Sequence, residues 1–327
     1  MLVDILNQQC KTDEVHLIIL NNKVEYQLLN KLDSRVSVHL CGRPESSKNP
    51  YYLLKLNLLI LSVNPDIIHC HSEGLIKYVL LPYKKVRTIH STLCSGTDYH
   101  HYKKLFCISK GVKSFTEKQG FSNTELVYNG IDMSVIDQKS DFKKKDFVRF
   151  INIGRFQKVK GQWLLIEAIK ILKEKNKRLN FHVDFIGEGN TLQECKDLVS
   201  KYGLNDYVTF LGLQPRDYFY PRMRSYDCYI QPSISEGFGL TIAEALSAKL
   251  PVITSDLDGP MEVIDFGKYG IPFASGNAEQ LAEKMDVFIE NGPDERMVNA
   301  GFDFVLENFC IERTAKKYIE EYKKVIR

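Results

Sequence analysis

The sequence predicts an α/β protein made of two domains, each built around a parallel sheet. Short apolar runs typical of buried strands alternate with segments whose apolar residues recur at helical spacing. This alternation stops at a polar segment, residues 137–146, whose lysines are expected to be solvated, and then begins again. The chain has 327 residues, more than a single hydrophobic core usually organises. We therefore expect one domain over residues 1–145, a hinge or linker at about residues 129–146, and a second domain over residues 146–310.

Composition and charge narrow the class of protein. With 44% hydrophobic residues the chain is globular, and its net charge of +3 is small. Residues 1–145 contain 20 Lys and Arg against 14 Asp and Glu, a net charge of +6, whereas residues 146–327 contain 24 against 27, a net charge of −3. The first half is only mildly basic and lacks the concentrated basic stripe that nucleic-acid binding requires. An anionic lipid surface or a phosphorylated acceptor is compatible with this charge.

The cysteines indicate a reduced, cytoplasmic protein. No pair has the C-x-x-C spacing, and several lie in strand-like apolar runs, so we expect small core residues. The eight are Cys10, Cys41, Cys70, Cys94, Cys107, Cys195, Cys228 and Cys310. No secretory signal is visible. The apolar segment at residues 53–63 is too short to span a bilayer and is interrupted by Lys55 and Asn57.

The first half is expected to open on a helix and continue as a series of strands. Residues 1–9 have apolar side chains at a spacing suited to a helix that packs on a sheet. The runs expected as strands are residues 15–20, 36–40, 66–70, 86–90, 105–108 and 125–128. Asn129-Gly130, after the last of them, is a strong turn signal.

Three histidines stand at the ends of expected strands. His90 closes the strand at residues 86–90, at the carboxyl edge where open α/β sheets bind ligands. The alternative is a histidine that only bonds to a neighbouring loop. His69 and His71 end an earlier strand and could point to one side as metal ligands. Because no third ligand lies at a recognisable spacing, no metal site is expected.

The second half opens on a strand, residues 148–154, that is followed by two cations. Arg155 comes directly after Gly154, and Lys160 stands five residues further on. Arginine can hold phosphate oxygens bidentately and lysine supplies a point charge, so together they suit a diphosphate. Either residue alone is equally well explained as a solvated surface cation. A helix is expected at residues 162–173.

Two further strands of the second half end in glycine. Residues 181–186 lead into Gly187, and the turn that follows lacks the third glycine of the G-x-G-x-x-G signature of nicotinamide enzymes. The strand that begins at Val208 ends in Gly212-Leu213.

The most informative segment follows a buried strand that Pro232 stops. Two carboxylates, Glu236 and Glu244, stand eight positions apart in Ser-Glu-Gly-Phe-Gly-Leu-Thr-Ile-Ala-Glu. Glycines at such a strand-to-helix turn let a ligand approach the backbone closely. The start of the helix expected at residues 240–248 offers unpaired N–H groups and a positive dipole end to an anion. The segment therefore indicates a pocket for an anionic ligand with hydroxyl groups, that is, a sugar nucleotide.

Glu244 has a second interpretation. Thr241-Ile242-Ala243-Glu244 fits a capping box, in which the glutamate returns to the N–H of the capping residue. The pairing of Glu244 with Glu236 favours the functional interpretation.

These motifs resemble those of the family 4 retaining glycosyltransferases. Glu236 and Glu244 match the Glu-x7-Glu signature of that family, and Gly154-Arg155 with Lys160 matches its Gly-Arg loop. The resemblance covers about residues 66–310 with specific motifs. It implies the GT-B fold of two facing Rossmann-like domains, with the acceptor side in the first and the donor in the second. It also implies that the last helix, residues 311–327, crosses back to the N-terminal domain.

The resemblance implies a set of site residues. The expected catalytic residues are His90, approaching the sugar from the first domain, and Glu236. Donor binding is expected at Gly154, Arg155, Lys160, Gly187, Leu213, Glu236, Gly237, Phe238, Gly239, Leu240 and Glu244. No metal or other cofactor is implied, because Arg155 and Lys160 would neutralise the leaving diphosphate.

The implied function is transfer of a hexosyl group from a nucleotide-diphosphate sugar to a hydroxyl group of an acceptor, and a lipid-linked saccharide is one acceptor of this kind. The resemblance places the enzyme in the cytoplasm, where it could also work at the inner face of the membrane. The implied pathway is the assembly of bacterial envelope polysaccharide, capsule or lipopolysaccharide. Nucleic acid is not an expected partner. The sugar, the base, the acceptor and the oligomeric state are not readable from the sequence.

One departure from the family pattern concerns the start of the chain. Relatives usually begin with one further strand and a Gly-Gly loop before the helix at residues 1–9, whereas the first glycine here is Gly42. We therefore expect the N-terminal domain to lack that strand and the natural protein to begin about 15–20 residues upstream. The missing loop leaves a non-catalytic donor-binding partner subunit as an alternative, and the shared two-domain fold leaves a sugar-nucleotide epimerase as a less favoured one.

Overall fold

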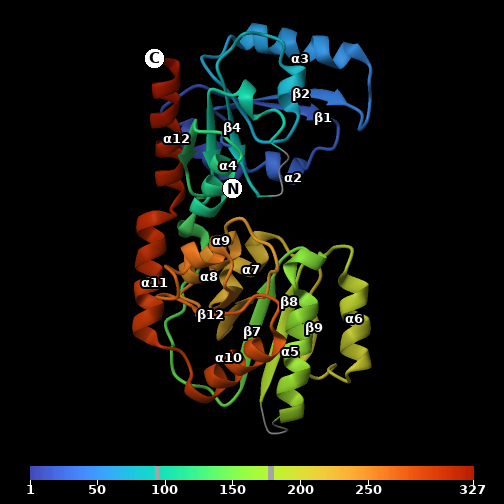
Figure 1. Cartoon of the computed structure of the whole chain (residues 1–327), viewed down its shortest axis with the longest axis vertical. Helices are drawn as coiled ribbons and strands as arrows, with labels where there is room; N and C mark the ends of the chain where they lie inside the picture. The colour runs from blue at the N-terminus through green and yellow to red at the C-terminus, as the bar shows by residue number, and fades with distance from the viewer. Residues whose placement is uncertain (93–95, 176–179) are drawn as a thin grey trace. The chain divides into compact units, whose positions relative to one another are not determined.

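The computed structural model describes residues 1–92, 96–175 and 180–327, so Cys94 lies outside the described residues. The chain divides into two compact units (Figure 1). The first comprises Met1–Asp132 together with Phe309–Arg327, and the second comprises Met133–Asn308. The segment at residues 137–146, which the sequence analysis assigned to a linker, belongs to the second unit.

The first unit alternates helices and strands. Its elements are α1 (Leu2–Gln9), β1 (Val15–Asn21), α2 (Tyr26–Leu29), β2 (Val36–Arg43), α3 (Pro50–Val63), β3 (Ile68–Cys70), η1 (Leu75–Tyr78), β4 (Lys85–Ile89), η2 (Tyr99–His101), β5 (Lys104–Cys107), α4 (Lys110–Lys118), β6 (Thr124–Leu126) and, from the end of the chain, α12 (Ile311–Ile326).

The strands of the first unit form two separate parallel sheets within the described residues. One contains β1 and β2, and the other has the order β3-β4-β5-β6. No further described strand pairs with the outer edge of β1 or of β3. Helix α1 packs against α12, and Ile5 of α1 shares a buried cluster with Phe106 of β5 and Tyr318 of α12. The C-terminal helix is therefore part of the core of the first unit.

The second unit contains a larger set of elements. They are η3 (Met133–Val135), β7 (Val148–Ile153), η4 (Lys158–Lys160), α5 (Gln162–Lys175), β8 (Phe181–Ile186), α6 (Leu192–Lys201), β9 (Val208–Phe210), α7 (Arg216–Met223), β10 (Cys228–Gln231), α8 (Leu240–Ser247), β11 (Val252–Ser255), α9 (Asp258–Val263), β12 (Ile271–Phe273), α10 (Ala278–Asn291) and α11 (Glu295–Asn308).

The strands of the second unit form one parallel sheet with the order β12-β11-β10-β7-β8-β9. From β7 the chain builds outward through β8 and β9, and it then returns to place β10 on the other side of β7. The point between β7 and β10 is a topological switch point, where ligands bind at the carboxyl ends of the strands in open α/β sheets.

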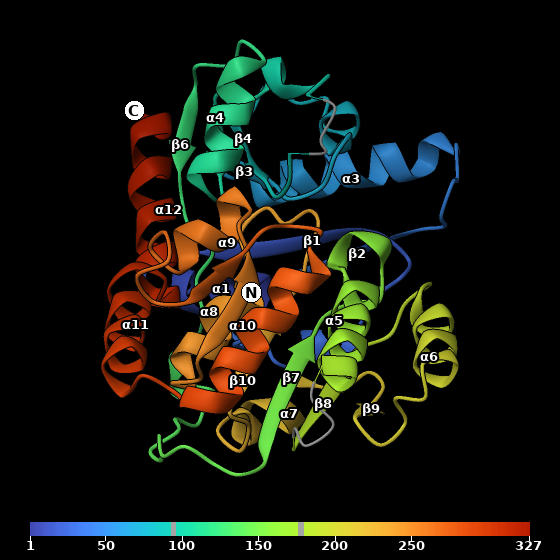
Figure 2. The ribbon, with the colours of Figure 1, turned by 60° about the horizontal axis from the view of Figure 1, so that its bottom comes forward.

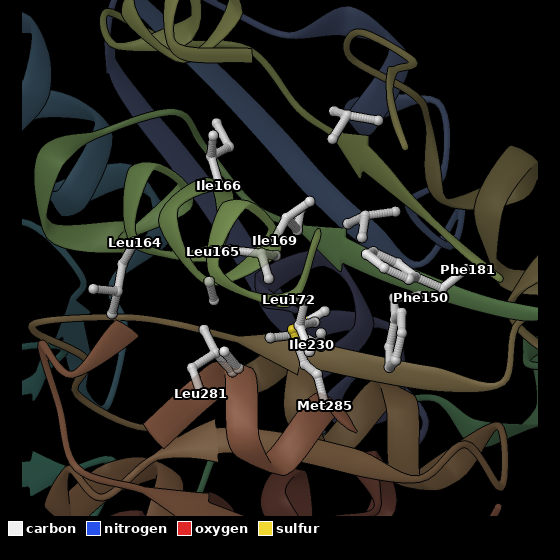
Figure 3. Packing of buried hydrophobic residues seen from close by; sticks show 14 of the residues in the cluster. Phe150, Leu164, Leu165, Ile166, Ile169, Leu172, Phe181, Ile230, Leu281 and Met285 are labelled. Carbon is white, nitrogen blue, oxygen red and sulfur yellow. The ribbon is translucent and has the colours of Figure 1, made fainter. Parts of the chain in front are cut away.

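Helices α5 and α10 pack side by side on this sheet (Figure 2). Figure 3 shows the cluster that they form, in which Leu165 and Ile169 of α5 and Met285 of α10 are buried together with Phe150 of β7. Burial of these apolar side chains is the main favourable contribution to the stability of the unit. It fixes β7, and so fixes the loop that leaves its carboxyl end.

Two lysines of the polar segment pair with the buried carboxylate of Asp227, and one of them is itself buried, so they are not simply solvated as predicted. Lys139 is buried and donates to the carbonyl oxygen of Tyr226 at 2.7 Å and to Asp227 Oδ1 at 3.1 Å. Lys145 lies 2.8 Å from the same carboxylate. Burial alone would raise the pKa of Asp227, but the hydrogen bonds from Lys145 and from the backbone N–H of Arg149 lower it. The segment is thus held to the second unit by charge.

Seven cysteines are described, and all of them are free thiols. Across the three described ranges, no helix has the length and apolar character needed to cross a membrane.

Candidate functional site

The loop after β7 is packed directly on the end of β10. Gly161 has a φ of +70°, and a Cβ atom at this position would lie 1.9 Å from the carbonyl oxygen of Pro232. Only glycine fits this close backbone approach. Arg155 is exposed near the start of the loop, and Lys160 lies in η4, directly before the glycine. The switch point therefore carries two cations.

Lys160 and Glu236 connect the two loops that border the switch point. The ammonium nitrogen of Lys160 donates to Glu236 Oε2 at 2.6 Å. The side chains are 27% and 15% exposed, so the pair is partly shielded from water. Gln231 Nε2, at the end of β10, donates to the same carboxylate oxygen at 3.2 Å. Glu236 is therefore fixed from both sides.

A buried polar chain continues from Gln231 into helix α8. Tyr229 donates its hydroxyl hydrogen to Thr241 Oγ1 at 2.7 Å, and Thr241 donates to Gln231 Oε1 at 3.2 Å. Burial raises the pKa of Tyr229, so its hydroxyl stays protonated and remains a donor. Sequence reasoning did not select Tyr229 or Gln231. The sequence signal that could have found them is the alternation of polar and apolar residues in the buried strand that contains both.

Helix α8 begins with its first residues close to the site. Gly239 is the N-cap with a φ of +101°, a conformation that glycine adopts without strain. The preceding Phe238 is buried and anchors the turn. Gly259 at the start of α9 packs so closely that a Cβ atom there would lie 2.7 Å from the carbonyl carbon of Gly237. The turn at residues 237–239 is therefore held in place by the buried Phe238 and by close packing against α9.

Glu244 is buried and has partners on helix α7. It accepts from the hydroxyl of Tyr220 at 2.7 Å and from Arg216 Nη2 at 3.3 Å. Because Gly239 is the N-cap, Thr241 is already the second residue of the helix. The capping-box interpretation of Thr241 and Glu244 is therefore wrong. Sequence reasoning missed Tyr220 and Arg216, which lie on a separate helix.

The backbone segments that follow β7, β8 and β9 are in direct contact with one another. Gly187 donates its N–H to the carbonyl oxygen of Gly212 at 2.8 Å. A Cβ atom on Gly187 would lie 2.0 Å from the carbonyl oxygen of Gly154, so these two glycines are in contact. Leu213, one residue beyond Gly212, is 69% exposed. The structure thus brings Gly154 and Gly187 together and leaves Leu213 at the surface.

His90 belongs to the first unit, where the tilted rings of three histidines lie close together in and just after β3 and β4. The ring centroids of His69 and His71 are 4.1 Å apart, and those of His71 and His90 are 5.9 Å apart. His69 also bonds to Thr88 Oγ1 at 2.8 Å and to the hydroxyl of Tyr322 at 2.5 Å. In the described residues no group of three His, Cys, Asp or Glu side chains is arranged to hold a metal ion.

Burial lowers the pKa of all three histidines. The pKa of His71 falls to about 3, and that of His69 falls well below its usual value, with a further lowering from the neighbouring rings. Burial and the charge of Arg87 lower the pKa of His90. At neutral pH the three rings are uncharged, so each can both donate and accept a hydrogen bond.

Comparison with known structures identifies the class of protein. A glycosyltransferase from Rickettsia africae aligns over 99% of this chain and 94% of that one, with a TM-score of 0.80 at 21% identity. HepE of Anabaena aligns over 99% of this chain and 95% of that one, with a TM-score of 0.83 at 17% identity. The fold is that of the GT-B glycosyltransferases, which confirms the predicted fold class.

Sequence comparison gives the family. Residues 133–302 match the family described as "Glycosyl transferases group 1", and residues 3–135 match "Glycosyltransferase Family 4". An uncharacterised glycosyltransferase of Methanocaldococcus jannaschii is 30% identical over 306 residues, with coverage of 82% of this chain and 71% of the relative. A Campylobacter jejuni N-acetylgalactosaminyltransferase is 25% identical over 315 residues, with coverage of 85% and 82%. The chain belongs to the group 1 glycosyltransferases of family 4 and is an enzyme that transfers a sugar from a nucleotide sugar.

Proposed function

We propose that this enzyme is a retaining glycosyltransferase that binds a nucleoside-diphosphate sugar at the carboxyl edge of the second sheet. The observation that carries the proposal is the Lys160–Glu236 contact of 2.6 Å at the switch point. It places a cation for phosphate beside a carboxylate for sugar hydroxyls, on two loops that meet between β7 and β10. The exposed Arg155 adds a second cation at the same edge.

Each residue of the site has a role in this proposal. Arg155 and Lys160 neutralise the diphosphate as it leaves, so no protein-bound metal is required. Glu236 and the N–H groups of residues 237–240 hold the sugar. Glu244, oriented by Tyr220, accepts hydrogen bonds from the ribose hydroxyls. Gly154 and Gly187 leave room for the phosphates, and the backbone beside Leu213 meets the base.

Uridine diphosphate is the nucleotide of the donor in this proposal. HepE of Anabaena was solved in complex with UDP-glucose, and TarM of S. aureus in complex with UDP among other ligands. Both align with this chain at TM-scores of 0.69 or above. These complexes support UDP as the first nucleotide to test.

The acceptor in this proposal is a hydroxyl of a lipid-linked saccharide. The similar Campylobacter jejuni enzyme is named for an acceptor on diphospho-undecaprenol, and a lipopolysaccharide outer core galactosyltransferase shares the fold with a TM-score of 0.76. These names support a role in envelope polysaccharide, capsule or lipopolysaccharide assembly, in the cytoplasm at the inner face of the membrane. His90 of the first unit is proposed as the second catalytic residue.

The test is steady release of UDP from UDP-sugars in the presence of an undecaprenyl-diphosphate-linked saccharide. We expect release with one UDP-sugar, a product with retained anomeric configuration, and loss of release in both Arg155→Ala and Lys160→Ala. His90→Ala should lower kcat and leave UDP affinity unchanged. Donor binding without release would favour the non-catalytic partner subunit, and conversion of the UDP-sugar without acceptor would favour the epimerase.

A further inference from the structure

Helix α3 of the first unit is apolar on two opposite faces. Its sequence, Pro-Tyr-Tyr-Leu-Leu-Lys-Leu-Asn-Leu-Leu-Ile-Leu-Ser-Val, contains six leucines. One face buries Leu56 and Ile60 in a cluster with Cys41 of β2. A helix that is hydrophobic all round is normally covered on all sides. The second face of α3 is nevertheless open to solvent, and Figures 1 and 2 show the helix along the outside of the first unit.

The open face is a continuous stripe. Tyr51, Leu54, Leu58 and Leu61 recur at helical spacing and are 57%, 60%, 55% and 51% exposed. Leu80 lies next to the helix, since its backbone N–H donates to Asn57 Oδ1 of α3 at 2.9 Å, and its side chain is 67% exposed. We call these five residues the α3 face. A helix of 14 residues is about 21 Å long, so the face is far larger than a single exposed leucine.

The sequence around helix α3 has a net positive charge. The helix itself carries no Asp or Glu; Lys55 lines the hollow beside the stripe, with its ammonium donating to the carbonyl oxygen of Cys41 at 3.0 Å, and Lys48 precedes the helix in the sequence. Residues 46–86 contain five lysines against two acidic residues. One of the two, Glu73, lies 3.7 Å from Arg87 and is directed toward that cation. The shallow hollow along the helix is lined by leucines, Tyr51, Lys55 and Ser62.

We propose that the α3 face docks on an anionic lipid bilayer, with its leucines in the acyl boundary and its lysines at the headgroups. Leucine and tyrosine on a helix face with flanking lysines match the chemistry of a membrane interface. A second copy of the chain is a poorer occupant, because a two-fold contact would bring like-charged lysines together. The inference rests on the first unit alone and is independent of the donor proposed for the second.

Vesicle flotation of the full chain tests the proposal. With vesicles of phosphatidylcholine and phosphatidylglycerol in a 7:3 ratio, we expect the protein to float, with weaker binding in 0.5 M NaCl and on phosphatidylcholine alone. The Leu54→Gln/Leu58→Gln variant should lose binding by about 30-fold or more, because two large apolar side chains no longer enter the interface. The matched control is Val287→Gln/Leu306→Gln, which removes two exposed apolar side chains from the second unit and should float normally.

Two further measurements show whether a loss of flotation comes from unfolding and whether the α3 face itself enters the lipid. Melting curves and UDP binding show whether the Leu54→Gln/Leu58→Gln variant is folded. In Leu58→Trp, a lipid with a brominated acyl chain should quench the added tryptophan, whereas fluorescence of the unchanged protein, whose single tryptophan is Trp163, should stay the same. Absence of flotation, flotation that both double variants retain, or a dimer in solution that Leu54→Gln/Leu58→Gln dissociates would each overturn the proposal.

Discussion

The ammonium of Lys160 and the carboxylate of Glu236 lie 2.6 Å apart. We propose that the first binds the diphosphate of the donor and the second its sugar, yet in this structure their charges neutralise each other. A diphosphate must compete with Glu236 for Lys160. We therefore predict that Glu236→Gln binds UDP about threefold to tenfold more tightly, because the competing charge is gone. The same variant should lose most turnover of the UDP-sugar. Calorimetry with UDP checks the first part, and weaker UDP binding in Glu236→Gln would contradict it.

The Glu244→Gln variant distinguishes a role of Glu244 in nucleotide binding from a role in stabilising the fold. Glutamine keeps an oxygen that can accept from Tyr220, so the melting temperature should change little. Loss of the charge should weaken UDP binding by about tenfold, because a charged acceptor for the ribose hydroxyls becomes a neutral one. Tyr220→Phe, which removes only the orienting hydroxyl, should give a smaller loss of affinity. A large fall in melting temperature with unchanged UDP affinity would assign Glu244 a structural role instead.

The sequence could predict the turn and helix that carry Glu236 and Glu244, but it could not predict the partners of Glu244. The order of strands and helices follows from local apolar periodicity, and the glycines mark the turn before α8. The partners of Glu244 could not be predicted, because Tyr220 and Arg216 lie on another helix, 24 and 28 residues away. The capping-box interpretation failed because the positive φ of Gly239 starts the helix earlier than the threonine.

The polar segment before β7 shows the same limit. Its lysines looked solvated because local composition does not reveal a partner 87 or 88 residues away. Asp227, which directly precedes β10, pairs with both Lys139 and Lys145. Long-range charge pairing is set by sheet order, which sequence periodicity does not specify. The domain limits and the roles of the site residues stay predictions.

Two glycines with nearly the same positive φ form a matched test of the loop after β7. Gly161 and Gly212 have φ values of +70° and +69°, but only Gly161 has a neighbouring atom within contact distance of a Cβ. Gly212→Ala should cost about 1 kcal/mol of unfolding free energy from backbone strain alone. Gly161→Ala should cost clearly more and should also weaken UDP binding, because Lys160 moves with the loop. Denaturant unfolding of both variants checks this, and equal losses would contradict the packing argument.

The three clustered histidines of the first unit predict a dependence of stability on pH. The folded-state pKa values of His69, His71 and His90 lie below the unfolded value of 6.5, so the unfolded chain binds more protons below that pH. Their contribution is present above pH 6.5 and is lost as pH falls toward the folded values. For His71, whose folded-state pKa is about 3, the unfolding free energy should fall by up to about 1.4 kcal/mol per pH unit below pH 6.5.

His71→Gln should flatten this dependence between pH 6.5 and 5. His182 acts in the opposite sense and in another range, because the hydrogen bond that its ring N–H donates to Asp184 raises its pKa, and its contribution is lost as pH rises above 6.5. His182→Gln is therefore the matched control and should leave the slope below pH 6.5 unchanged. A slope that is identical in the unchanged protein and His71→Gln would contradict the burial of the ring.

Calorimetric titration with nucleoside diphosphates tests the central claim, donor binding at the switch point of the second sheet. We expect UDP to bind with one molecule per chain, and Arg155→Ala and Lys160→Ala each to lose about 10-fold to 100-fold in affinity, because each removes a charge-assisted contact worth about 1.5–3 kcal/mol. GDP, ADP, CDP and dTDP are titrated in the same way, so that a different base is recognised as such. Binding of none of the five, or equal affinity in the unchanged protein and both variants, would contradict the account.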